Sequence, residues 1–259
     1  MKTKRIEIGN AYIDCIYNNE GIKRSALLVI PGGGYGIVCS DREGYPIAEA
    51  FMPYEFNCFV LNYSVGEKAK FPEPLIEASK AMQYIRENAD ELNIDPERVF
   101  VVGFSAGGHL SGSLGTLWHT IKEVPEGINR PTGMILGYPV STSKAGEGHL
   151  GSFYNILGTT TPSESELAKY SLENCVDEKT CPAFIFHTGD DAVVPVMGSI
   201  RLAEALSRNK IPYEMHIFPS APHGIALGNK ITAKGNPLWV DERIAEWVRL
   251  AAGWTKTIK

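Results

Sequence analysis

Gly103-Phe104-Ser105-Ala106-Gly107 follows an apolar run at residues 98–102 and precedes a helical pattern at residues 106–120. A Gly-x-Ser-x-Gly sequence between a strand and a helix is typical of a tight turn that lifts a nucleophilic serine above a parallel sheet. Small residues let the strand and the helix approach closely, and the helix N-terminus favours negative charge beside Ser105. The stretch therefore predicts Ser105 as a nucleophile, against the alternative of a glycine-rich turn with an ordinary surface serine.

The rest of the chain alternates between β-rich apolar runs and helical patterns. This alternation predicts an α/β fold with a mostly parallel central sheet and helices on both faces. Residues 139–173 interrupt the rhythm with many Ser, Thr and Gly residues, and we expect a loop-rich insert near the active site there. No linker or internal repeat divides the chain, so residues 1–259 are expected to form one domain. The predicted strands are 6–8, 12–17, 26–30, 58–63, 98–104, 133–137, 183–188 and 213–218, and the predicted helices are 46–55, 72–92, 106–120, 196–208 and 241–252.

Composition and charge narrow the class of protein. The net charge is -5, and the only basic run is at residues 2–5, which argues against a nucleic-acid partner or a polybasic membrane patch. No stretch is apolar for long enough to span a bilayer. The 5 cysteines form no CxxC pair, which argues against a disulfide framework or a zinc site. Scattered thiols, and the absence of a signal-like apolar stretch in residues 1–17, predict a cytoplasmic protein. No metal-ligand spacing or dinucleotide fingerprint is present, so we expect no metal and no cofactor.

The serine requires a general base, and His223 is the candidate. It lies in the segment Pro219-Ser220-Ala221-Pro222-His223-Gly224, which follows the last predicted strand. This segment should lie at the same edge of the sheet as Ser105, because the carboxyl ends of parallel strands meet there. The other histidines are assigned lesser roles: His109 packs or hydrogen-bonds behind the serine, His119 lies near a helix end, His149 in the insert can contact substrate, and His187 and His216 belong to strands.

An acid must orient the histidine and stabilise its charged form. Two adjacent carboxylates, Asp190 and Asp191, follow the predicted strand at residues 183–188. We favour Asp191, because the chain is still turning off the strand at Asp190, which is expected to brace the loop. The chain order Ser105, Asp191, His223 is that of the α/β-hydrolases rather than of the chymotrypsin or subtilisin types.

Backbone N–H groups must stabilise the negative oxygen that forms when a serine attacks a carbonyl carbon. The residue after the nucleophile, Ala106, is expected to supply one N–H group. Gly33 and Gly34, which follow the predicted strand at residues 26–30, are expected to supply the others, because glycine lets the backbone approach the oxygen closely. The alternative for these glycines is a plain turn.

Five stretches together resemble the α/β-hydrolase esterases related to acetyl xylan esterases and other carbohydrate esterases, within the wider group of hormone-sensitive-lipase-like enzymes. The resemblance extends over nearly the whole chain, and it places the triad of the family on Ser105, Asp191 and His223. The stretches are Val29-Ile30-Pro31-Gly32-Gly33-Gly34-Tyr35, Asn93-Ile94-Asp95-Pro96-Glu97-Arg98-Val99, Gly103-Phe104-Ser105-Ala106-Gly107-Gly108-His109-Leu110, Asp191-Ala192-Val193-Val194-Pro195 and Phe218-Pro219-Ser220-Ala221-Pro222-His223-Gly224.

The resemblance implies a serine esterase that removes small acyl groups, acetyl above all, from a sugar or oligosaccharide. Pro31 replaces the histidine of the lipase-like His-Gly-Gly-Gly motif, which argues against long acyl chains. Tyr35 and Tyr154 are candidates to stack on or hydrogen-bond a sugar, although either residue can simply pack. The alternatives are a feruloyl or aryl esterase, a formamidase or small peptidase with the same triad, and a non-catalytic binding module. Esterases of this size are often homodimers, but no stretch of this sequence identifies an interface.

Overall fold

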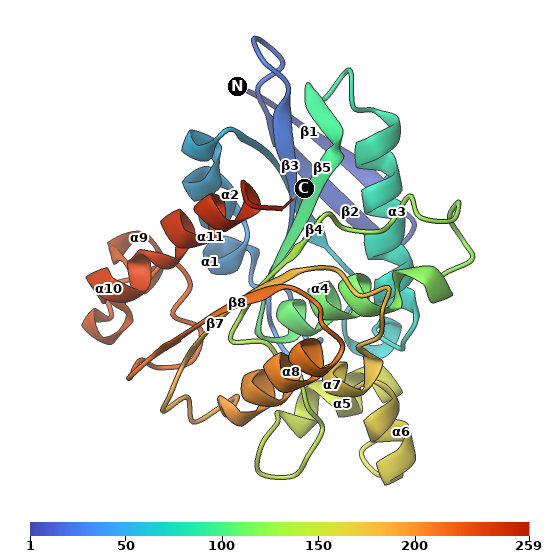
Figure 1. Cartoon of the computed structure of the whole chain (residues 1–259), viewed down its shortest axis with the longest axis vertical. Helices are drawn as coiled ribbons and strands as arrows, with labels where there is room; N and C mark the ends of the chain where they lie inside the picture. Colours follow the sequence, from blue (N-terminus) through green and yellow to red (C-terminus); the bar gives the residue numbers. More distant parts are fainter. Residues whose placement is uncertain (259) are drawn as a thin grey trace.

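A central sheet of eight strands runs through the computed structural model, which describes residues 1–258 (Figure 1). The strand order is β1-β2-β4-β3-β5-β6-β7-β8. β1 pairs with β2 and β2 with β4 in antiparallel fashion, whereas all the later pairs are parallel. The prediction of a mostly parallel sheet is therefore confirmed. The strands are β1 (Lys2–Ile8), β2 (Ala11–Tyr17), β3 (Arg24–Ile30), β4 (Phe56–Asn62), β5 (Ile94–Phe104), β6 (Met134–Gly137), β7 (Ala183–Thr188) and β8 (Tyr213–Phe218).

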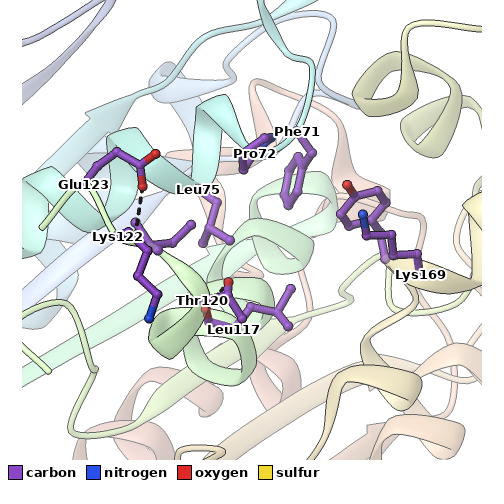
Figure 2. A pocket seen from close by; sticks show the side chains of 10 residues that line it. Phe71, Pro72, Leu75, Leu117, Thr120, Lys122, Glu123 and Lys169 are labelled. Carbon is purple, nitrogen blue, oxygen red and sulfur yellow. Dashed lines mark hydrogen bonds between the residues drawn. The ribbon is translucent and has the colours of Figure 1, made fainter. Parts of the chain in front are cut away.

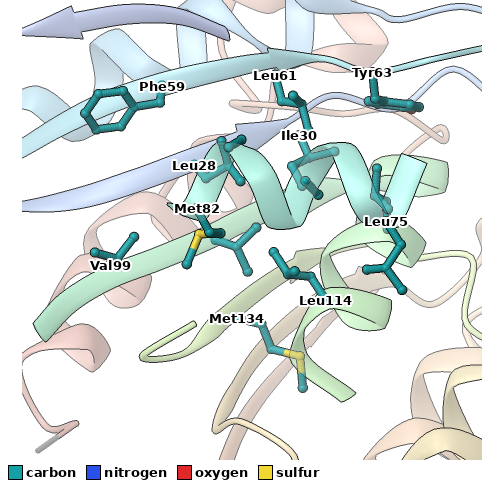
Figure 3. Close-up of a cluster of buried hydrophobic side chains, with 14 of the residues drawn as sticks. Leu28, Ile30, Phe59, Leu61, Tyr63, Leu75, Met82, Val99, Leu114 and Met134 are labelled. Atoms are coloured by element: carbon teal, nitrogen blue, oxygen red, sulfur yellow. The ribbon is translucent and has the colours of Figure 1, made fainter. Parts of the chain in front are cut away.

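Helices cover both faces of the sheet, which explains why its central strands are apolar throughout. On one face, α3 (Glu73–Glu87), α4 (Ser105–Leu117) and α8 (Met197–Arg208) contribute to one apolar cluster, part of which Figure 3 shows. On the other face, α2 (Tyr45–Phe51) and α11 (Trp247–Thr255) contribute to a second cluster. Successive residues of β3 alternate between the two: Leu28 belongs to the first cluster and Leu27 and Val29 to the second.

Residues 139–173 differ in part from the prediction of a loop-rich insert, because nearly half of the segment is helical. It forms α5 (Leu150–Leu157) and α6 (Glu164–Lys169), and α7 (Leu172–Cys175) follows at its end. Many of its polar and glycine residues lie at helix ends. Ser163 caps α6 with a reciprocal pair of bonds to Glu166, and Gly158 ends α5 with a φ of 66°. Short, capped helices therefore produced the composition that predicted loops.

The remaining helical elements lie in the connections between strands or in the segment after β8. None of the helices formed by residues 1–258 has the length and apolar composition to cross a membrane. The short α-helices are α1 (Ser40–Glu43), α9 (Lys230–Ala233) and α10 (Glu242–Ala245), and the 3-10 helices are η1 (Met52–Tyr54), η2 (Gly66–Lys68), η3 (Trp118–Thr120) and η4 (Pro237–Trp239).

Candidate active site

Ser105 lies at the turn between β5 and α4, with a φ of 52° that side-chain-bearing residues rarely adopt. The turn is tight enough to require glycine on both sides. A Cβ added at Gly103 would lie 2.2 Å from the carbonyl oxygen of Gly107. A Cβ added at Gly107 would lie 2.2 Å from the carbonyl oxygen of Ile30 in β3. The strand, the turn and the helix therefore hold Ser105 in a strained and fixed position.

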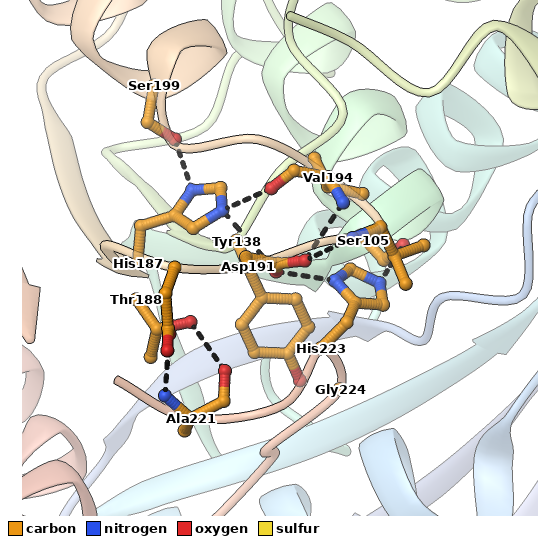
Figure 4. Close-up of polar contacts among 12 residues, drawn as sticks. Ser105, Tyr138, His187, Thr188, Asp191, Val194, Ser199, Ala221, His223 and Gly224 are labelled. Carbon is orange, nitrogen blue, oxygen red and sulfur yellow. Dashed lines mark hydrogen bonds and ion pairs between the residues drawn. The ribbon is translucent and has the colours of Figure 1, made fainter. Parts of the chain in front are cut away.

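The structure brings Ser105, His223 and Asp191 into one hydrogen-bonded chain (Figure 4). The Nδ1 atom of His223 lies 2.7 Å from Oδ2 of Asp191, and its Nε2 atom lies 2.9 Å from Oγ of Ser105. Because a carboxylate can only accept, it fixes the ring hydrogen of His223 on Nδ1. The lone pair on Nε2 then accepts the Ser105 hydroxyl hydrogen, which is the geometry that a serine nucleophile and its base require.

Asp191 is buried and is well supplied with donors. Its Oδ1 atom accepts hydrogen bonds from the backbone N–H groups of Val193 and Val194, each at 2.9 Å. Its Oδ2 atom also lies 3.5 Å from Nε2 of His187. Burial alone would raise the pKa of the Asp191 carboxyl, but its contacts with His187 and His223 lower the pKa to well below its usual range. The carboxylate is therefore ionised at every pH at which the protein would be assayed.

The neighbouring Asp190 is exposed and points to a different partner. Its Oδ2 atom accepts a hydrogen bond from the Ser220 hydroxyl at 2.6 Å, and its Oδ1 atom accepts one from the backbone N–H of Ala221 at 3.1 Å. Both partners belong to the loop that carries His223. Asp190 thus braces this loop, as we expected from the sequence, and does not contact the ring itself.

The glycine loop after β3 passes beside the serine, since a Cβ added at Gly32 would lie 3.0 Å from Cβ of Ser105. Gly33 and Gly34 have φ values of 130° and 63°, which other residues rarely adopt. Within residues 1–258, the backbone N–H groups of Gly33 and Gly34 have no hydrogen-bond acceptor. The N–H of Ala106, in the first turn of α4, has no acceptor within its own helix either. These three donors are available to a negatively charged oxygen.

Comparisons with known proteins agree with this geometry. The family described as BD-FAE matches residues 14–134, and the prolyl oligopeptidase family matches residues 141–238. The chain is 40% identical over 219 residues to endo-1,4-beta-xylanase B of Butyrivibrio fibrisolvens and 32% identical over 225 residues to the acetylxylan esterase of Xylanibacter ruminicola. These matches include 82% and 85% of this chain but only 34% and 45% of the two relatives, so the chain spans less than half the length of either.

A solved structure matches almost end to end. The acetyl ester-xyloside bifunctional hydrolase from Caldicellulosiruptor lactoaceticus is 33% identical, with a TM-score of 0.82 over 96% of this chain and 88% of that one. The chain belongs to the α/β-hydrolase esterases. It resembles the acetylxylan esterase-like group within that family, and the family predicted from the sequence is confirmed.

Tyr35 of this esterase is not placed where the sequence predicted, and its assignment to substrate binding is wrong. Its side chain is fully buried, and its hydroxyl lies 2.7 Å from Nδ1 of His109. Its ring packs edge-on against Tyr63 and Phe71. The residue follows the glycine loop with a φ of 61°, and its side chain lies in the apolar core rather than against a bound molecule.

His109 also belongs to this buried cluster. Its Nε2 atom lies 2.8 Å from the carbonyl oxygen of Tyr170, so both ring nitrogens have partners. Burial lowers the pKa of His109 to about 4. A neutral, fully bonded imidazole is a structural element of the esterase, in line with the packing role expected of it.

Glu43 is a residue that sequence reasoning missed. Its buried carboxylate accepts the backbone N–H of Gly32 at 2.8 Å and the hydroxyl of Tyr138 at 2.7 Å. The ring of Tyr138 in turn packs edge-on against His223, with 5.2 Å between the ring centroids. Glu43 stands in a short charged helix, Ser40–Glu43, whose sequence looks like that of an exposed turn, so no signal in the sequence pointed to it.

A cavity of about 420 Å³ lies away from the triad (Figure 2). It opens between the start of α3 and the end of α4, and Lys122 and Lys169 stand at its edge. None of the three triad residues lines it. The esterase therefore has a hollow behind the nucleophile helix that is separate from the site around Ser105. Its apolar lining includes Phe71, Pro72, Leu75, Leu117 and Ile121.

Proposed function

We propose that this esterase removes small acyl groups, principally acetyl, from a sugar or oligosaccharide, with Ser105 as its nucleophile. The observation that carries this proposal is the hydrogen-bonded chain from Asp191 through His223 to the Ser105 hydroxyl, at 2.7 and 2.9 Å. His223 takes the hydroxyl hydrogen as the serine oxygen attacks the ester carbonyl, and Asp191 stabilises the imidazolium that forms.

The negative oxygen of the tetrahedral intermediate is held by the N–H groups of Gly33, Gly34 and Ala106. One such donor contributes about 3–4 kcal/mol of transition-state stabilisation in a comparable hydrolase. His223 then donates its proton to the leaving alcohol oxygen, and the acyl group stays on Ser105 as an ester. A water molecule, deprotonated by His223, attacks this ester and releases the carboxylic acid, which restores the serine hydroxyl.

A polar cavity of about 720 Å³ supports a carbohydrate as the alcohol part of the substrate. The half-buried ring of Tyr154 lines it beside Asn155 and Lys70. The side-chain amide of Asn155 also donates to the carbonyl oxygen of Gly34 at 2.8 Å, so the cavity adjoins the glycine loop. An aromatic ring with donors and acceptors around it suits a sugar, and we assign Tyr154 to substrate binding. The names of the relatives, which concern xylan, xylosides and acetyl esters, support the same substrate class.

The experiment that tests the proposal is acetate release from acetylated xylo-oligosaccharides by the wild type and by Ser105→Ala. We expect release by the wild type alone, while Ser105→Ala keeps the wild-type melting temperature. A fluorophosphonate probe should label the wild type and not the variant. Full turnover by Ser105→Ala would contradict the assignment of the nucleophile. A folded wild type that neither labels nor turns over any ester would instead favour a binding module.

An amide-directed hydrolase is the second candidate, because residues 141–238 match the prolyl oligopeptidase family. The same triad would serve it. Short peptide and formamide substrates, assayed beside the acetylated sugars, separate the two candidates. A kcat/KM that is higher for an amide than for every acetyl ester would replace the proposed activity with this one.

A further inference from the structure

His149 stands at the start of α5 and caps that helix with its side chain. Its Nδ1 atom accepts a hydrogen bond from the backbone N–H of Ser152 at 3.3 Å, and the Ser152 hydroxyl lies 2.9 Å from the same atom. A histidine is uncommon at this position, where Asn, Asp and Ser are preferred. The cap alone therefore does not explain why the residue is an imidazole.

The cap determines which ring nitrogen carries the hydrogen. A backbone N–H can only donate, so Nδ1 of His149 must present its lone pair to Ser152. The hydrogen of the neutral ring is then on Nε2. Among residues 1–258, no group accepts a hydrogen bond from this Nε2–H. The side chain is half-buried, and its Nε2 atom is accessible rather than buried. The ring thus offers one fixed donor to whatever lies beside it.

The ring lies beside the site around Ser105. A Cβ added at Gly34 would lie 3.9 Å from Cε1 of His149 and equally far from Oγ of Ser152, so the ring edge faces the glycine loop. Burial, followed by the proximity of His223, lowers the pKa of His149. Two neighbouring imidazoles repel each other when both are charged. His149 therefore stays neutral while His223 takes up and gives back a proton.

From this geometry we infer that His149 is a substrate-binding residue whose Nε2–H donates a hydrogen bond to an oxygen of the alcohol part of the ester. The inference rests on the proposed function and names a residue that selects its substrate class. A sugar presents a hydroxyl or ring oxygen close to its acetyl ester, whereas a simple aryl acetate has no such oxygen. The donor therefore discriminates between the two kinds of ester and takes no part in proton transfer.

The test uses His149→Asn, which keeps an acceptor for the Ser152 N–H and removes the Nε2 donor. We expect the melting temperature to stay at that of the wild type. The ratio of kcat/KM for acetylated xylo-oligosaccharides to kcat/KM for 4-nitrophenyl acetate should fall about tenfold, as expected for the loss of one hydrogen bond. The change should lie mainly in KM. His216→Asn, on a distant strand, is the matched control and should leave the ratio unchanged.

Three results would overturn the inference. An unchanged ratio in His149→Asn would show that the imidazole donor contacts no part of the sugar. An equal loss for both esters would assign His149 to the architecture of the site rather than to the alcohol part. A wild type that cleaves the aryl acetate but no acetylated sugar would end the proposed substrate class and this inference together. Only the first two results leave the proposed function in place.

Discussion

The carboxylate of Glu43 accepts the hydroxyl hydrogen of Tyr138 at 2.7 Å, and the same hydroxyl accepts the backbone N–H of Ala226 at 3.0 Å. The second carboxylate oxygen of Glu43 accepts the backbone N–H of Gly32. One buried side chain therefore links the glycine loop to the segment that follows His223. Glu43 thus connects the two halves of the proposed chemistry, the oxyanion donors and the general base, without a hydrogen bond to Ser105 or His223.

Replacing Glu43 with Gln should loosen both connections. An amide has one accepting oxygen where the carboxylate has two, so either Gly32 or Tyr138 loses its acceptor. The loss of a buried hydrogen bond to a charged group should lower the free energy of unfolding by about 1.5–3 kcal/mol. Urea denaturation measures this change. We also expect kcat on 4-nitrophenyl acetate to fall, because Gly33 and His223 would both be held less firmly.

The matched control is Glu49→Gln, in which an exposed glutamate of α2 without a hydrogen-bond partner in the described chain is changed in the same way. Its free energy of unfolding should stay within about 0.5 kcal/mol of the wild-type value, and its kcat should stay within about twofold. If Glu43→Gln behaved like this control, the link between the two loops would contribute nothing to the free energy of unfolding or to kcat.

The tight approach of α4 to β3 gives a second prediction. Gly107→Ala would place a Cβ 2.2 Å from one backbone oxygen and 2.3 Å from the next, in Ile30 and Pro31, which no rotamer can relieve. We expect the variant to unfold at a much lower temperature or to be insoluble. Gly253→Ala, in the helical interior of α11, meets nothing within 4 Å and should raise stability by about 0.5–1 kcal/mol. Melting temperatures of the two variants in calorimetry check the prediction, and equal shifts would contradict it.

Most of the structural features that depend on short, local sequence patterns were predicted correctly. β7 has the predicted limits of residues 183–188. The tight turn at Ser105 was predicted from Gly103 and Gly107, where a side chain would collide with the neighbouring backbone. The chain order of Ser105, Asp191 and His223 was readable because each residue follows a strand, and parallel strands end at one edge. These features depend on positions that are neighbours along the chain or are equivalent in successive β-α units.

What the sequence did not predict depends on long-range contacts. Tyr35 stands next to the glycine loop, yet its positive φ and a hydrogen bond to His109, 74 positions away, keep it in the core. Glu43 and Tyr138 are 95 positions apart, and nothing in either local pattern indicates their contact. The helices in residues 139–173 were missed because they are short and their caps use the Ser, Thr and Gly residues that are also typical of loops.

The two adjacent aspartates give a third prediction, because they have different partners. Asp191→Asn should keep the fold but hold His223 in the wrong tautomer, and kcat on 4-nitrophenyl acetate should fall about 10⁴-fold, as in a comparable triad. Asp190→Asn loses only part of its contact with Ser220 and Ala221, so its kcat should fall less than about tenfold. Steady-state kinetics of the two variants decide between them, and a larger loss in Asp190→Asn would move the acid to that residue.

His109 should make the protein less stable as the pH falls. An unfolded histidine takes up a proton near pH 6.5, whereas burial lowers the pKa of folded His109 to about 4. Between these values the unfolded state binds more protons, so the stability that is present above pH 6.5 is lost progressively as the pH falls towards 4. This one group should cost about 2 kcal/mol between pH 7.5 and pH 5.

Urea denaturation of the wild type and of His109→Gln at these two pH values isolates the contribution of His109. The variant is expected to be less stable at pH 7.5, because it cannot reproduce both the contact with Tyr35 and the contact with Tyr170. Its loss of stability on going to pH 5 should nevertheless be smaller than that of the wild type. His216→Gln, on the edge strand β8, should follow the wild type. Parallel losses in the wild type and His109→Gln would mean that His109 is protonated in the folded protein at pH 5, and that other groups cause the acid sensitivity.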